Sequence, residues 1–326
     1  MKNLPKLSVK IKRNALLGLA IVVGAGAGTA AIAQSASAAP AAAVVTAEQS
    51  LGVYNQFQKY LKNSAKTPYS LVQARNYLFN HIKRVDSWRA TVMVLQLENA
   101  QKARLNVFSE KFFLEKVQKV IDAAYRKGGR ETGLTYSSLL KYITDHSVRA
   151  LLTESYGYGY KLETSEGMYY PVMHYEGFKF FKPYIGKDIA AYIDLMAADS
   201  NKPALSDAAI VITWNELINR TLALETYVKE YPKSNRTAAV KDKLKLMETF
   251  VFYGSNNTPA YQYGAKGELT TIDPELRQAY EKALQSGVGD SRVLKTIQNV
   301  LGMLDTSGDK WNGNIEKFLR DFIQNG

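Results

Sequence analysis

The chain has 326 residues with 42 Lys or Arg and 30 Asp or Glu, which gives a formal net charge of +12 at pH 7. It contains no cysteine, which excludes disulfides, a thiol nucleophile and a lipid-modified cysteine behind a signal peptide. The fold must therefore be stabilised by burial of apolar side chains, and the chain is long enough for that.

Residues 1–38 have the pattern of a secretory signal peptide. A basic leader without acidic residues precedes an apolar stretch at 15–33, and Ala36-Ser37-Ala38 supplies small residues at positions −3 and −1 of a cleavage site. We expect cleavage before Ala39 and a secreted protein, extracellular or associated with the cell wall. An uncleaved anchor is the alternative, because the apolar stretch approaches the ~20 residues that span a bilayer. The basic leader and the lack of cysteine are typical of a Gram-positive bacterium.

Residues 39–130 form a basic region, with 15 Lys or Arg against 6 Asp or Glu, whereas residues 131–326 have 22 against 24. Outside a cell, such a region attracts polyanions: teichoic-acid-type wall polymers, anionic lipid headgroups or DNA. The alternative is a solvated helix surface without a specific partner. The predicted polyanion-binding residues are Lys111, Lys116, Lys119, Arg126, Lys127 and Arg130.

The same region is predicted to be helical. Residues 70–127 contain no Gly or Pro, and apolar residues recur there at spacings of three, four and seven. One helix of that length is rare in a compact domain. We therefore favour two or three packed helices, capped at Ser87 or Ser109 and preceded by a helix at 48–61.

A tyrosine-rich β-hairpin is predicted near residues 156–175. Two extended runs flank the turn Ser165-Glu166-Gly167, and Pro171 places the second run at a sheet edge. Exposed tyrosines there could stack on sugar rings or contact a protein partner, or the same rings could clamp the hairpin onto a helical core. The candidate partner-binding residues are Tyr156, Tyr158, Tyr160, Tyr169 and Tyr170.

Helices are expected again at 188–198, 207–231 and 237–253, with Pro232 ending the second of these. Residues 225–234 resemble the junction of a tetratricopeptide-like helical hairpin, in a single copy. The predicted fold is mainly α, a helical bundle or helical-hairpin array with one small β-hairpin. The predicted parts are the signal peptide (1–38), the basic helical region (39–130) and an α-helical domain (131–326).

A broader resemblance covers about residues 158–263. The segment is similar to a family of secreted or envelope-attached Gram-positive proteins without an assigned activity, which implies a recurring extracellular domain. The residues that carry it are Tyr160-Lys161-Leu162, Glu166-Gly167-Met168-Tyr169-Tyr170-Pro171, Tyr192-Ile193-Asp194, Asp207-Ala208, Trp214-Asn215-Glu216-Leu217, Tyr231-Pro232-Lys233-Ser234 and Gly254-Ser255-Asn256-Asn257-Thr258-Pro259.

Residues that could carry a reaction are few. His81, His146 and His174 have no zinc-ligand spacing, and no G-x-S-x-G motif is present. Pairs such as Glu163 with Glu166, or Asp194 with Glu216, could serve a glycosidase only if the fold brought them close.

A calcium loop is the remaining metal-site candidate. Asp305, Ser307, Asp309 and Glu316 fit its positions 1, 3, 5 and 12, but Lys310 stands where the loop needs glycine. We predict no metal and no cofactor there, and a polar loop in which Asp309 caps the last helix.

These observations favour a non-catalytic secreted protein that associates with the cell envelope or extracellular matrix through its basic helical region, with a helical domain that presents a binding surface. The partner would be an anionic cell-wall polymer or another extracellular polyanion, with a further protein partner possible. The alternative from another class is a cell-wall or polysaccharide-active hydrolase.

Overall fold

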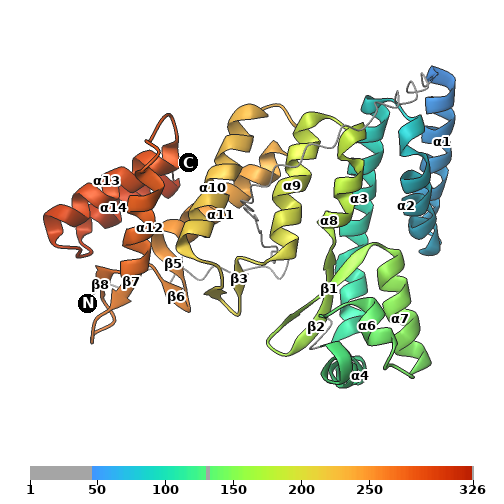
Figure 1. The fold of residues 1–326 in the computed structure, drawn as a ribbon, viewed down its shortest axis with the longest axis horizontal. Coiled ribbons are helices and arrows are strands. Elements are labelled where there is room, and N and C mark those ends of the chain that lie inside the picture. Colours follow the sequence, from blue (N-terminus) through green and yellow to red (C-terminus); the bar gives the residue numbers. More distant parts are fainter. Residues whose placement is uncertain (1–45, 130–132, 325–326) are drawn as a thin grey trace, which may run out of the picture. The chain divides into compact units, whose positions relative to one another are not determined.

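Helices dominate the computed structural model, which describes residues 46–129 and 133–324 (Figure 1). The prediction of a mainly α fold with a small β-hairpin is confirmed. The predicted signal peptide and Arg130 lie outside the described residues.

The chain forms two compact units. The N-terminal unit comprises residues 46–163 and 169–190, and the C-terminal unit comprises residues 164–168 and 191–324. The helices before residue 129 share a core with the hairpin that follows at residues 160–173. One example is the buried hydroxyl of Tyr160, which donates to the backbone carbonyl of Gln101 over 2.7 Å.

The N-terminal unit begins with three helices. Helix α1 (Ala47–Asn63) starts in a capping box formed by Thr46 and Gln49. It packs with α2 (Tyr69–His81), which continues into the short helix η1 (Ile82–Arg84), and both contact α3 (Ser87–Ser109). The cap of α3 is Asp86, one residue before the predicted Ser87, because its carboxylate accepts from the backbone N–H of Arg89.

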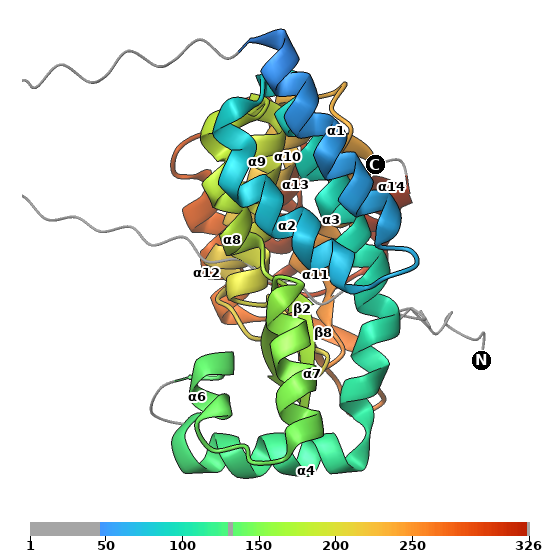
Figure 2. The same ribbon diagram turned by 90° about the vertical axis from the view of Figure 1, so that its right-hand side faces the viewer.

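Short helices follow at the end of α3. They are η2 (Glu110–Phe113), α4 (Glu115–Ala124), η3 (Tyr125–Gly129), α6 (Tyr136–Leu140) and α7 (His146–Gly157). Helix α4 lies across the lower end of α3 in Figure 2. The predicted helical segment 70–127 is therefore a set of separate helices, as we favoured. Ser109 ends α3 and does not cap α4, which lacks a side-chain cap.

The predicted tyrosine-rich hairpin consists of β1 (Tyr160–Ser165) and β2 (Met168–Met173). Its turn uses positive φ at Glu166 (53°) and Gly167 (73°). The side-chain amide of Gln118 on α4 clasps the backbone of Tyr169: it donates to the carbonyl over 2.8 Å and accepts from the N–H over 2.9 Å.

Three helices follow the hairpin: α8 (Tyr175–Phe178), η4 (Lys179–Tyr184) and α9 (Lys187–Asn201).

In the C-terminal unit, a prediction about the next helix is wrong. Residues 207–213 are not helical, because β3 (Leu205–Ser206) and β4 (Ala209–Ile210) form a tight hairpin, and α10 spans Trp214–Glu230. The turn residues Asp207 and Ala208 have positive φ values of 50° and 55°. Helix α11 (Thr237–Tyr253) packs against α10, so the predicted helix pair on either side of Pro232 is confirmed.

The rest of the C-terminal unit combines two more short hairpins with three helices. The hairpins are β5 (Gly254–Ser255) with β6 (Thr258–Pro259), and β7 (Tyr261–Tyr263) with β8 (Leu269–Ile272). The helices are α12 (Pro274–Leu284), α13 (Arg292–Ser307) and α14 (Gly313–Gln324). These short hairpins come in addition to the predicted one, and their strands of two to four residues leave no alternating pattern in the sequence.

Candidate functional site

Two of the predicted polyanion-binding lysines join parts of the N-terminal unit through ion pairs. Lys116 on α4 lies 2.8 Å from a carboxylate oxygen of Asp145, the residue that caps α7. Lys111 on η2 lies 3.7 Å from Glu154 on α7. The hydrogen bonds from Lys116 and Ser147 hold the pKa of Asp145 below its usual range. These lysines therefore contribute to the local structure as well as to the surface charge.

Two of the cations farther along α4 and on η3 also have acidic neighbours. Lys119 pairs with Glu115 over 2.5 Å, and Arg126 pairs with Asp122 over 2.9 Å. Lys127 is exposed, and no ion pair involves it within the described residues. Because most of these charges are balanced at close range, the α4 surface presents less net positive charge than its sequence suggests.

A second set of cations lies on α1, on η1 and in the turn after α1. Between residues 46 and 84, Glu48 is the one acidic residue against six Lys or Arg. Five of these cations are exposed and have no carboxylate partner among the described residues: Lys59, Lys62, Lys66, Lys83 and Arg84. The side chains of Lys59 and Lys62 lie opposite the buried face of α1, which holds Val53 and Phe57. We call these five residues the α1–η1 cations.

The candidate partner-binding tyrosines are mostly in the core. Tyr158, Tyr160 and Tyr169 are buried, whereas Tyr156 is 63% exposed and Tyr170 is half-buried. The rings of Tyr158 and Tyr160 pack around Phe108, with ring centroids 5.2 and 6.1 Å from it. The structure therefore agrees with the alternative in which the rings clamp the hairpin onto helices.

The hydroxyl groups of two buried tyrosines have carboxylate partners. The hydroxyl of Tyr158 donates to Glu154 over 2.7 Å, and that of Tyr169 donates to Asp122 over 3.1 Å. Burial, followed by these hydrogen bonds, raises the pKa of each tyrosine to about 12. The two hydroxyls are therefore protonated donors inside the fold at neutral pH.

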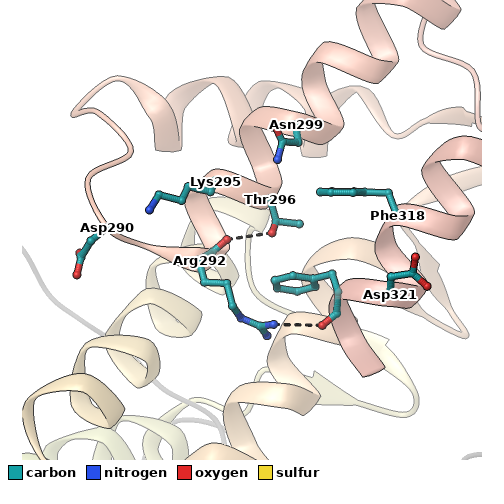
Figure 3. Close-up of a pocket in the computed structure, with 8 residues that line it drawn as sticks. Asp290, Arg292, Lys295, Thr296, Asn299, Phe318 and Asp321 are labelled. Carbon is teal, nitrogen blue, oxygen red and sulfur yellow. Dashed lines mark hydrogen bonds between the residues drawn. The ribbon is translucent and has the colours of Figure 1, made fainter. Parts of the chain in front are cut away.

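A cavity of about 400 Å³ lies between α13 and α14 in the C-terminal unit (Figure 3). Its wall includes Arg292, whose guanidinium lies 3.9 Å from the ring centre of Phe322 and donates to the backbone carbonyl of that residue over 3.1 Å. The same guanidinium donates to both carboxylate oxygens of Glu248 over 2.7 Å, and Glu248 is 1% exposed. The charge of Arg292 is thus neutralised and its position is fixed.

The start of α13 is held by a carboxylate from α10. Glu225 is buried and accepts the Arg292 backbone N–H over 2.6 Å, the Val293 N–H over 3.3 Å and the Ser291 hydroxyl over 2.5 Å. Ser291 in turn accepts the Leu294 N–H over 3.1 Å. The backbone N–H groups of the first helical turn, which have no acceptor within the helix, are therefore hydrogen-bonded, and α13 is fixed beside the cavity.

The remaining lining residues present polar groups and one ring to the cavity. Phe318 points from α14 toward Thr296 and Asn299 on α13 (Figure 3). The side chains of Lys295, Asn299 and Asp321 make no ion pair or hydrogen bond within the described residues. Asp290 pairs with Lys229 over 3.2 Å, and this interaction lowers its pKa.

The glycosidase pairs considered from the sequence are engaged in other contacts. Glu163 pairs with Lys161 over 3.2 Å. Glu216 pairs with Lys202 over 2.7 Å and with Arg220. One carboxylate of each candidate pair is thus held in an ion pair with a neighbouring cation.

A raised carboxyl pKa occurs elsewhere, in the buried pair of Asp199 and Lys243. Burial raises the pKa of Asp199 to about 6, against the opposing charges of Lys243 and Arg220. Because the carboxyl group is buried, we assign it a structural role.

The segment considered as a candidate calcium loop is held by an arginine. The Arg277 guanidinium donates to Asp305 over 2.7 Å and to Asp309 over 2.6 Å, so a cation already sits between the two carboxylates. The cap of α14 is Asn312, which accepts the backbone N–H groups of Asn314 and Ile315; the prediction that Asp309 is the cap is therefore wrong. Within the described part of the chain, no group of three or more His, Asp or Glu could hold a metal ion.

The cavity was not predicted from the sequence. The apolar patterns of α13 and α14 were visible, but Phe318 and Phe322 fit an ordinary core stripe. The sequence does place four polar residues on one side of the amphipathic helix α13, at positions 292, 295, 296 and 299. This spacing is the pattern from which the cavity could have been predicted.

Comparison of the chain with protein-family models, with curated proteins and with solved structures gives no match. The likeness of residues 158–263 to a Gram-positive family therefore stays a prediction. Among residues 46–129 and 133–324, no helix combines the length and apolar character that crossing a membrane requires.

Proposed function

We propose that the protein is secreted and non-catalytic, and that it associates with the cell envelope by binding an anionic wall polymer through the N-terminal unit. The observation that carries the proposal is the set of α1–η1 cations, which are exposed on a segment with a single acidic residue. A linear polyanion attracted by the whole basic unit would make its closest contacts there.

The proposed contact surface consists of the α1–η1 cations and not of the lysines on η2 and α4 that the sequence suggested. On α4, a phosphate would have to compete with carboxylates such as Asp145 and Glu115, which already occupy the lysine ammonium groups. At Lys59, Lys62 and Lys66, which have no carboxylate partner among the described residues, a phosphate would replace only water. The α4 cations then contribute mainly to the long-range attraction.

The test compares two triple variants in binding to isolated cell walls that contain teichoic acid. One carries Lys59→Gln, Lys62→Gln and Lys66→Gln. The matched control carries Lys111→Gln, Lys116→Gln and Lys119→Gln. Both lower the net charge by the same amount, so the long-range attraction falls equally and the difference reports close contact.

We expect the first variant to bind roughly tenfold more weakly than the wild type, since exposed charge contacts contribute about 0.5 kcal/mol each. The control should lose less. Wild-type protein should be released as salt shortens the screening length from ~10 Å at 0.1 M to ~3 Å at 1 M. Equal loss in both variants would refute the placement at α1, and retention of wild type at 1 M salt would refute an electrostatic contact.

Secretion is tested separately by N-terminal sequencing of protein from the culture medium. We expect the mature chain to begin at Ala39, because Ala36-Ser37-Ala38 supplies the small residues that signal peptidase requires. An intact N-terminus found only in the membrane fraction would show an anchor instead.

A further inference from the structure

The cavity between α13 and α14 presents an unusual combination of groups. Its fixed wall consists of Arg292 stacked on Phe322, and Phe322 also packs edge-on against Phe252 with ring centroids 5.2 Å apart. Phe318 has no ring partner within the described residues and is half-buried at the cavity. Its volume of about 400 Å³ falls in the range of small-ligand sites.

The charges at the cavity balance. Arg292 is neutralised by Glu248, and Asp290 is paired with Lys229. This leaves one cation, Lys295, and one anion, Asp321, so the site offers no net charge to attract an ionic ligand. A neutral ligand fits this balance better than a phosphate or a carboxylate does.

The polar groups at the cavity also define hydrogen-bonding needs. The Lys295 ammonium only donates, the ionised Asp321 carboxylate only accepts, and the Asn299 amide does both. All three side chains are exposed, so water binds them in the free protein. A ligand that replaces this water at all three must carry several groups that donate and accept, which is the property of sugar hydroxyls. A pyranose ring in addition has a flat C–H face that can lie on an aromatic ring such as Phe318.

We infer that the α13–α14 cavity is a binding site for a neutral hexopyranose oligosaccharide, with Phe318 as the stacking platform and Lys295, Asn299 and Asp321 as hydroxyl-binding groups. We propose binding without cleavage. Hydrolysis needs a protonated carboxyl group beside the scissile bond, and both carboxylates at the cavity are exposed to water: Asp290 is 91% exposed in its pair with Lys229, and Asp321 is exposed as well. This inference does not depend on the α1–η1 cations.

The experiment titrates the mature chain, residues 39–326, with three neutral probes: the N-acetylglucosamine tetramer, maltotetraose and cellotetraose. Binding is followed by calorimetry and by amide NMR shifts. We expect at least one probe to bind with a Kd of about 1 mM or lower. The shifted amides should include Thr296 and Asn299. Affinity should be the same in 0.1 M and 1 M NaCl because the ligand is neutral, which separates this site from polyanion binding.

Phe318→Ala should weaken binding roughly tenfold, since it removes the stacking platform. Asn299→Ala should weaken it about fivefold by removing one hydrogen-bonding group. The matched control is Phe180→Ala, which removes a 48% exposed ring from the N-terminal unit and should leave affinity unchanged. Amide spectra of each variant show whether it is folded.

Several results would overturn the inference. They are the absence of saturable binding for all three probes at about 10 mM, amide shifts that fall outside α13 and α14, and an affinity that is unchanged in the folded Phe318→Ala and Asn299→Ala variants. Binding that disappears at 1 M NaCl would assign the sugar contact to a charged surface instead.

Discussion

The carboxylate of Glu225 should be one of the most important single groups for the stability of the C-terminal unit. It accepts the first two backbone N–H groups of α13 and is nearly inaccessible to solvent. In Glu225→Ala these donors and the Ser291 hydroxyl lose their acceptor, with little space for water to replace it. Hydrogen bonds to a charged group contribute about 1.5–3 kcal/mol each, and one of the two backbone bonds is long. We therefore expect a loss of about 3–5 kcal/mol.

Two further variants separate the contributions. Glu225→Gln keeps an acceptor but removes the negative charge at the helix N-terminus, so we expect a smaller loss of about 1–2 kcal/mol. Ser291→Ala removes the N-cap and should cost about 1 kcal/mol. The losses of Glu225→Ala and Ser291→Ala should not add in the double variant, because the two side chains share a hydrogen bond. Glu230→Ala, at an exposed position of the same helix, is the control and should stay within about 0.5 kcal/mol of the parent.

Urea unfolding followed by tryptophan fluorescence measures these effects. Of the three tryptophans, Trp214 and Trp311 lie in the C-terminal unit. Trp88 lies in the N-terminal unit and is 68% exposed, so Trp88→Phe gives a tolerable background in which fluorescence reports the C-terminal unit alone. With a denaturant slope of about 2 kcal/mol/M, the midpoint of Glu225→Ala should fall by about 2 M urea. A midpoint within the range of Glu230→Ala would refute the capping argument.

Three other perturbations have defined outcomes. Gly254→Ala should lower the free energy of unfolding by about 3 kcal/mol or more in the same urea assay, because Gly254 has φ 74° and a Cβ would lie 2.3 Å from the carbonyl oxygen of Thr258. The free energy of unfolding of the wild type relative to Asp199→Asn should fall as pH rises from about 4 to about 6, because burial raises the pKa of Asp199 to about 6 and the folded state then holds a proton that the unfolded state has released. Chelator should leave the melting temperature unchanged, because Arg277 occupies the space between the carboxylates of Asp305 and Asp309; a calcium-dependent rise would contradict this.

Helices were predictable wherever an apolar face repeats over several turns. The predicted helix at 48–61 is α1, and the predicted 237–253 coincides with α11. The capping residue at the start of a helix was less predictable, because the residue at which the backbone turns into the helix decides which side chain is the cap. Asp86 and Ser87 are both suitable cap residues, and their positions relative to the Arg89 N–H decide between them.

The short hairpins left no usable pattern in the sequence. The turn between β3 and β4 places Asp207 and Ala208 at positive φ without a glycine, and such turns are recognised mainly by Gly or Asn. Tertiary contacts hold it in place, including the Asn257 amide, which donates to the Asp207 carbonyl over 2.6 Å. Contacts between residues so far apart in the chain cannot be read from local composition.

The candidate sites also depend on contacts between residues that are far apart in the chain, so they could be predicted only in part. The basic composition of residues 39–130 was visible in the sequence, but the partners of each cation were not. Lys116 finds Asp145 because α4 and the start of α7 are brought together in space. The cavity likewise required the relative placement of α13 and α14, which depends on buried groups such as Glu225 and Glu248.

The hydrogen bonds between Gln118 and Tyr169 protect the β1–β2 hairpin from pairing with a strand of another molecule. Backbone groups along a strand point alternately to either side, so Tyr169 and Pro171 both face away from β1, on the free edge of β2. Gln118 occupies both groups of Tyr169, and Pro171 has no N–H to offer. A strand from another molecule would find little to pair with along this edge, so the hairpin is a poor template for aggregation.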